Sequence, residues 1–210
     1  MKHWPVLTAA LLVVGVATFS YLHTASGQSE AEWVTLFDGK NLDNWNSIGD
    51  ANWTLADGVV VADKGNGFLV SKDSYTDFQI RAEFWIDDDA NSGIFIRCTD
   101  PAKVTGATAY EVNIWDKRPD PSYGTGAIVD VAKVSPMPTA ADKWNVYEIT
   151  AKGSTFTVTL NGQKTVDGAT DEKFKSGHIA LQHGLGLKDD KGVASDKGVV
   201  KFRKVEIRPL

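Results

Sequence analysis

The segment DDDANSGIFIRCTD, residues 87–100, places a full positive charge inside a run that otherwise has the pattern of a β-strand. Successive side chains of a strand point to opposite faces of the sheet. Ile94 and Ile96 therefore predict a core face, and Phe95 and Arg97 are expected on the opposite face. A guanidinium in that position can bind a carboxylate, a hydroxyl group or an oxyanion.

Two further strand patterns, residues 78–86 and 110–116, show the same alternation and flank this segment. Strands that are consecutive in sequence are often neighbours in a sheet. We therefore expect their outward side chains to line one sugar-sized hollow, with aromatic rings and charged groups as its walls. The outward set is Glu83, Trp85, Phe95, Arg97, Glu111, Asn113 and Trp115. In the alternative without a ligand, Arg97 only pairs with the two glutamates, which is worth about 0.2–1 kcal/mol.

Strand patterns separated by Gly, Asn, Asp and Pro turns recur along the whole chain, and no segment has the pattern of an amphipathic helix. The stretch TVTLNGQKTV predicts a hairpin, because Asn161 and Gly162 suit a tight turn. About a dozen strands predict an all-β fold with two packed antiparallel sheets, a sandwich or jelly roll. The segment LGLKDDKGVASDKG, residues 185–198, is expected to be a solvated loop.

The first residues have the pattern of a secretory signal peptide. Lys2 and His3 precede an apolar run, and small residues up to Gly27 follow it. The run is short for a membrane span, which needs roughly 20 residues, so cleavage after Gly27 is favoured over an uncleaved anchor. We expect a signal peptide over residues 1–27, a single domain over residues 28–210, and a periplasmic or extracellular location.

Composition excludes several partner classes. The part after residue 27 carries 27 acidic and 21 basic residues, a net charge of −6, without a basic cluster. Nucleic acid and anionic membranes are therefore poor partners. Cys98 is the sole cysteine, so the fold has no internal disulfide. Six tryptophans in this part suit either core packing or the stacking of sugar rings.

Several segments resemble, in order and spacing, the bacterial 3-keto-disaccharide hydrolase family, which is related in fold to concanavalin A-like lectins and glucanases. They are WVTLFDGKNLDNW, DFQIRAEFWI with NSGIFIR, YEVNIWD, GTGAIVDV, KWNVYEIT, VTLNG, and GHIALQHG with VVKFRKVEI. The chain departs from the family pattern by a longer loop before its last strand and by lacking an acidic residue before His183. Both departures concern the choice of substrate more than the fold.

The resemblance implies the cleavage of glycosides whose glucose-type ring carries a ketone at C3. Such a ketone acidifies the hydrogen at C2, so that a base can remove it and the group at C1 can leave. On this chain the resemblance implies three catalytic residues. Arg97 would stabilise the oxyanion, Glu111 would act as base or metal ligand, and His183 would act as acid, base or ligand. Asp116 ranks below Glu111, because alternation turns it to the other face.

The expected substrate-binding residues are Glu83, Trp85, Asn91, Phe95, Asn113, Trp115 and Gln182. A divalent metal, if the site uses one, would be held by Glu111 and His183, and no other cofactor is expected. A glucanase is disfavoured, because Glu111 is followed by Asn113 and by Lys117-Arg118 where a second glutamate should fall. The remaining alternative is a lectin-like module that binds an oligosaccharide or glycoside without cleaving it.

Overall fold

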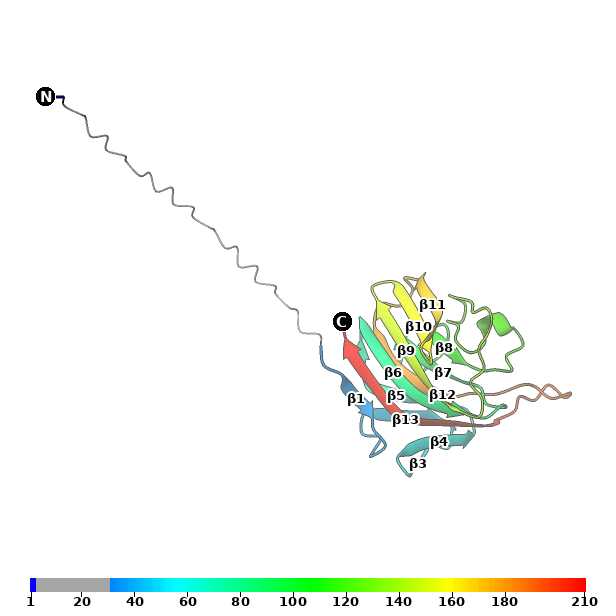
Figure 1. Cartoon of the computed structure of the whole chain (residues 1–210). Helices are drawn as coiled ribbons and strands as arrows, with labels where there is room; N and C mark the ends of the chain where they lie inside the picture. Colours follow the sequence, from blue (N-terminus) through cyan, green and yellow to red (C-terminus); the bar gives the residue numbers. More distant parts are fainter. Residues whose placement is uncertain (3–30) are drawn as a thin grey trace.

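The computed structural model describes residues 1–2 and 31–210. The strands between residues 34 and 209 form two antiparallel sheets packed face to face (Figure 1). The all-β sandwich predicted from the sequence is confirmed. Most of the predicted signal peptide lies outside the described residues. No helix among the described residues has the length and apolar character of a membrane span.

Sheet A has the strand order β11-β10-β9-β6-β13-β4-β3, and β1 also pairs with β13. Its strands are β1 (Val34–Phe37), β3 (Thr54–Ala56), β4 (Val59–Lys64), β6 (Phe78–Ile86), β9 (Trp144–Lys152), β10 (Thr155–Leu160), β11 (Gln163–Thr170) and β13 (Lys197–Pro209). Sheet B has the order β2-β5-β12-β7-β8. Its strands are β2 (Trp45–Gly49), β5 (Gly67–Tyr75), β7 (Ser92–Cys98), β8 (Tyr110–Ile114) and β12 (Gly177–His183).

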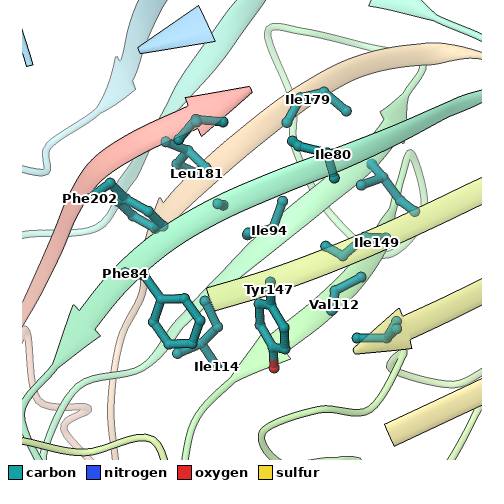
Figure 2. Packing of buried hydrophobic residues seen from close by; sticks show 14 of the residues in the cluster. Ile80, Phe84, Ile94, Val112, Ile114, Tyr147, Ile149, Ile179, Leu181 and Phe202 are labelled. Carbon is teal, nitrogen blue, oxygen red and sulfur yellow. The ribbon is translucent and has the colours of Figure 1, made fainter. Parts of the chain in front are cut away.

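The core fills the space between the sheets (Figure 2). Phe84, Tyr147 and Phe202 of sheet A face Ile94 and Val112 of sheet B, and all five are fully buried. Burying a side chain of this size stabilises the fold by about 1.5–3 kcal/mol. The hydroxyl of Tyr147 donates to the carbonyl of Asn113 at 2.6 Å, so the one polar atom of this ring is satisfied.

The chain passes from sheet A to sheet B between β6 and β7, whereas β7 and β8 are neighbours in sheet B. The expectation that all three strands share one sheet is therefore wrong for β6. Alternation itself holds along β6, where buried and partly buried residues alternate over its full length. What alternation cannot give is the sheet to which the strand belongs.

Two long loops flank the end of sheet B. Residues 184–196 connect β12 to β13 and project from the sandwich (Figure 1), with Leu187 45% and Val193 63% exposed. Residues 115–143 connect β8 to β9 and contain the short helix η1 (Pro121–Tyr123). Asp116 anchors this second loop, because its carboxylate accepts from the hydroxyl of Thr125 at 2.6 Å and from the amide of Ala140 at 2.8 Å.

Candidate functional site

The outer face of sheet B carries a row of polar side chains with a gap at its centre. Gly93 pairs with Asn113 across β7 and β8. The pairing of Leu181 with Ile94 places Gln182 beside Gly93 on its other side. Residues directly opposite each other on neighbouring strands share a face. Because Gly93 has no side chain, a notch lies at its position on this face, between the amide side chains of Asn113 and Gln182.

A second row lies beside the first and ends in a carboxyl group. Ala180 pairs with Phe95, and Phe95 pairs with Glu111. Phe95 packs edge-on against Phe68, with 5.3 Å between the ring centroids, and both belong to an apolar cluster separate from the core between the sheets. Phe95 is 3% exposed, so it forms the floor of this face.

The carboxyl group of Glu111 reaches over Gly93. A Cβ atom placed on Gly93 would lie 3.1 Å from Oε1 and 3.2 Å from Cγ of Glu111. Burial raises the pKa of Glu111 to about 7, with Arg118 lowering it and Asp130 raising it. Glu111 and Asp130 also line a small hollow of about 100 Å³ at the sheet edge. A carboxyl with this pKa can take and return a proton at neutral pH.

Four polar atoms around the notch are buried and lack a hydrogen-bond partner within the described part of the chain. They are Asn91 Oδ1, Asn113 Oδ1, Gln182 Oε1 and Trp115 Nε1. The amide groups of Asn91 and Asn113 are held at their other end, where Nδ2 donates to the carbonyls of Leu185 at 2.6 Å and Tyr123 at 2.7 Å. An unmade hydrogen bond of this kind costs about 1–3 kcal/mol. Sugar hydroxyl groups are donors and acceptors that suit such atoms.

Six of the residues predicted for the site thus come from one face of sheet B or its rim: Asn91, Phe95, Glu111, Asn113, Trp115 and Gln182. Sequence reasoning missed Gly93, Arg118 and Asp130. The Asn-Ser-Gly run at the start of β7 was a signal for Gly93, because a glycine inside a strand often marks close approach of a ligand or backbone. No comparable signal pointed to Arg118 or Asp130.

The predicted placement of Arg97 is wrong. On β12 only Ile179 stands between the partners of Phe95 and Cys98, so β7 carries one extra residue, a β-bulge. Arg97 has a left-handed backbone with φ of 53° and is 1% exposed. The bulge breaks the alternation and turns its side chain to the inner side of the sandwich, where the guanidinium lies 5.3 Å from the Phe156 ring centroid.

The predicted placement of His183 at the site is also wrong. Its ring nitrogens lie 2.7 Å from the carbonyl oxygens of Gly65 and Gly198, and the residue is 1% exposed. Alternation was a usable signal here, because His183 has the same parity as the core residues Ile179 and Leu181. The pairing of Glu111 with His183 around a metal is therefore not supported. Among the described residues no group of three His, Cys, Asp or Glu side chains could hold a metal ion.

Glu83 and Trp85 lie on the outer face of sheet A, on the opposite side of the sandwich from Glu111. Arg203 donates to the carboxylate of Glu83, and the Nζ atom of Lys201 lies 4.2 Å from the ring centroid of Trp85. Their predicted placement with Glu111 is wrong because β6 belongs to the other sheet. Both side chains are engaged by neighbouring cations.

Residues 32–208 match the model of the 3-keto-alpha-glucoside-1,2-lyase-like domain. The chain belongs to this family. A comparison with curated proteins found no match. Among solved structures, a candidate glycosyl hydrolase from Parabacteroides distasonis ATCC 8503 is 26% identical with a TM-score of 0.66, over 85% of this chain and all of that one.

Two more distant structures show the fold alone. The β-glucanase of Bacillus licheniformis is 14% identical with a TM-score of 0.60, over 87% of this chain and 100% of that chain. The carbohydrate-binding module CBM66 of Bacillus subtilis is 18% identical with a TM-score of 0.54, over 85% of this chain and 97% of that chain. The concanavalin A-like architecture predicted from the sequence is confirmed, and the domain is of a carbohydrate-active kind.

Proposed function

We propose that this domain cleaves 3-keto-glycosides and that Glu111 removes the hydrogen at C2 of the sugar. The observation that carries the proposal is the position of the Glu111 carboxyl over Gly93, with a pKa raised by burial to about 7. A base works best when its pKa lies near the working pH. A hydrogen next to a ketone is acidic enough for such a base, whereas the same hydrogen in an ordinary glycoside is not.

The proposed reaction balances as an elimination followed by a hydration. The C2–H bond breaks toward a Glu111 oxygen, a double bond forms between C1 and C2, and the C1–O bond to the aglycone breaks. The departing oxygen takes a proton, which protonated Glu111 can return. Water then adds its hydroxyl to C1 and a proton to C2, so that the products are the aglycone and a free 3-keto sugar.

Other residues of the site would position the sugar. The amide oxygens of Asn91 and Gln182 can accept from ring hydroxyl groups, since neither has another donor in the described chain. Gly93 leaves room for the Glu111 carboxyl to lie over β7, where it can meet the ring. Arg118 is the cation whose charge acts on Glu111, so it replaces Arg97 as the candidate that stabilises the oxyanion.

A matched pair of substrates tests the proposal. The protein is incubated with a 3-keto-glucoside and with its unoxidised parent, and release of the aglycone is measured. We expect release from the ketone alone. Glu111→Gln keeps the shape of the side chain but cannot take a proton. It should lower the rate by about 1,000-fold, within the roughly 10²–10⁴-fold contribution of acid–base catalysis, and should leave the thermal unfolding transition in place.

A lectin-like module is the second candidate. The similarity in fold to a carbohydrate-binding module and the unpartnered amide oxygens favour it. Binding of both sugars without turnover of either would support the module and contradict the enzyme.

We also infer from the pattern of residues 1–27 that the domain acts in the periplasm or outside the cell. The N-terminal sequence of the exported protein would test this location.

A further inference from the structure

A second hollow lies at one end of the sandwich, away from the amide row. It has a volume of about 350 Å³, within the roughly 300–1,000 Å³ of small-ligand sites. Three connections meet there: the β5–β6 turn with Asp77, the β9–β10 turn with Gly153 and Ser154, and the β11–β12 loop with Glu172 and Phe174. We call this hollow the end pocket. None of its residues belongs to the amide row around Gly93, although Asp171 and Phe174 also line the small hollow beside Glu111 and Asp130.

Arg97 forms part of the wall of the end pocket and is almost completely paired. Its Nε donates to the carbonyl of Thr76 at 2.9 Å, and its Nη1 donates to the carbonyls of Gly153 and Phe174 at 2.7 Å and 3.2 Å. Its Nη2 donates to Asp77 Oδ1 at 3.1 Å. A guanidinium has five N–H groups, so within the described chain one N–H on Nη2 has no partner.

The backbone at Arg97 is also strained. A φ of 53° is uncommon for a residue other than glycine, and such strain costs on the order of 1–3 kcal/mol. Residues held in this way cluster at ligand sites, where the surrounding structure maintains them. Here the strain places a nearly buried charged side chain against a hollow.

The charges around the end pocket decide which ligand suits it. Asp77 neutralises Arg97, and the remaining charged side chains are Asp171, Glu172 and Lys175. Asp171 is already bound by the hydroxyl of Tyr110 at 2.6 Å. The lining is therefore slightly acidic, which disfavours an anion. It offers the Nη2 group of Arg97, a hydroxyl from Ser154 and carboxylate acceptors. Phe174 adds apolar surface, with Lys173 Nζ 4.9 Å from its ring centroid.

We infer that the end pocket binds a neutral sugar. A pyranose presents hydroxyl donors and acceptors around its edge and C–H groups on its faces, which match the mixed polar and aromatic lining. The site is distinct from the notch at Gly93, and it needs no chemistry at Glu111. The domain would then hold a glycan at two places, one for cleavage and one for attachment.

An NMR titration tests this inference. The amide chemical shifts of the whole domain are followed while methyl α-D-glucopyranoside or maltose is added. Neither probe carries a C3 ketone, so neither should be cleaved. We expect saturable shifts at the amides of Gly153, Ser154 and Lys175, which line the end pocket and not the hollow beside Glu111. Shifts confined to Asn91, Asn113 and Gln182 would overturn it. The absence of a saturable shift up to about 10 mM sugar would also overturn it, because that concentration is about ten times the Kd of a weak complex near 1 mM.

Variants of the rim sharpen the test without disturbing Arg97. Ser154→Phe fills the pocket and should raise the Kd at least tenfold, and Glu172→Ala removes an acceptor from an exposed position and should also weaken binding. The matched control is Thr155→Phe, the next residue, which is exposed and does not line the pocket. Turnover of a 3-keto-glucoside should change less than twofold in all three. Equal Kd values for Ser154→Phe and Thr155→Phe would also contradict the inference.

Discussion

Glu111 must be ionised before it can accept a hydrogen from C2. Its pKa of about 7 means that the active, charged fraction grows as the pH rises through neutrality. We therefore predict that kcat on a 3-keto-glycoside is low at pH 5, rises with a midpoint near 7 and levels off above about pH 8. The measurement is a pH–rate profile with a no-enzyme control at each pH. A rate that stays flat from pH 5 to pH 9 would argue against Glu111 as the base.

Arg97 illustrates how one residue can look catalytic in sequence and act structurally. Its guanidinium ties three backbone carbonyls and Asp77 together while buried. Arg97→Met removes the donor of all these bonds, whereas Asp77 still accepts from the amide of Gly153 at 2.9 Å. We therefore predict a loss of at least about 1.5–3 kcal/mol in the free energy of unfolding, the contribution of one hydrogen bond to a charged group. Urea denaturation measures it, with exposed Lys152→Met as control. A variant of normal stability that has lost turnover would restore the catalytic role expected from the sequence.

At the scale of strands, the β7–β8 pair was predictable and the bulge was not. Alternation assigned Ile94, Val112, Glu111 and Asn113 to their correct faces, because each strand keeps its period there. It failed at Arg97, where an extra residue changes the parity. A bulge is defined by how the residues of β7 pair with those of β12, so the sequence of β7 alone does not reveal it.

The row across β12, β7 and β8 depends on the missing side chain of Gly93. Gly93 does not have a positive φ, so alanine suits its backbone, but the new Cβ would crowd the Glu111 carboxyl at 3.1 Å. We predict that Gly93→Ala lowers kcat/KM about 10- to 100-fold, because small misplacements of a catalytic group have effects of this size. The control is Gly186→Ala, where the added Cβ meets no atom closer than 3.4 Å. If both variants match the unaltered protein, Gly93 does not determine the position of the Glu111 carboxyl.

At the scale of the molecule, the sandwich separates two kinds of outer surface. On sheet A the tryptophans are covered by cations, as where Arg203 lies 4.2 Å from the ring centroid of Trp144. On sheet B the outward amides keep unpartnered oxygens. The strand patterns predicted two sheets but not their membership, since the β6–β7 connection gives no sign of crossing between them. That crossing is why Glu83 and Trp85 were expected beside Glu111 and lie on the far side.

The central claim is that the domain breaks the C2–H bond of a 3-keto-glycoside, and deuterium at C2 reports this directly. The reaction is run in D₂O, stopped early, and the released sugar is analysed by NMR against a no-enzyme control. The elimination and hydration proposed for Glu111 predict one deuterium at C2 of the 3-keto sugar, and no such product with Glu111→Gln. A released sugar that keeps its original hydrogen at C2 would contradict the claim, because it would show cleavage at C1 without proton removal.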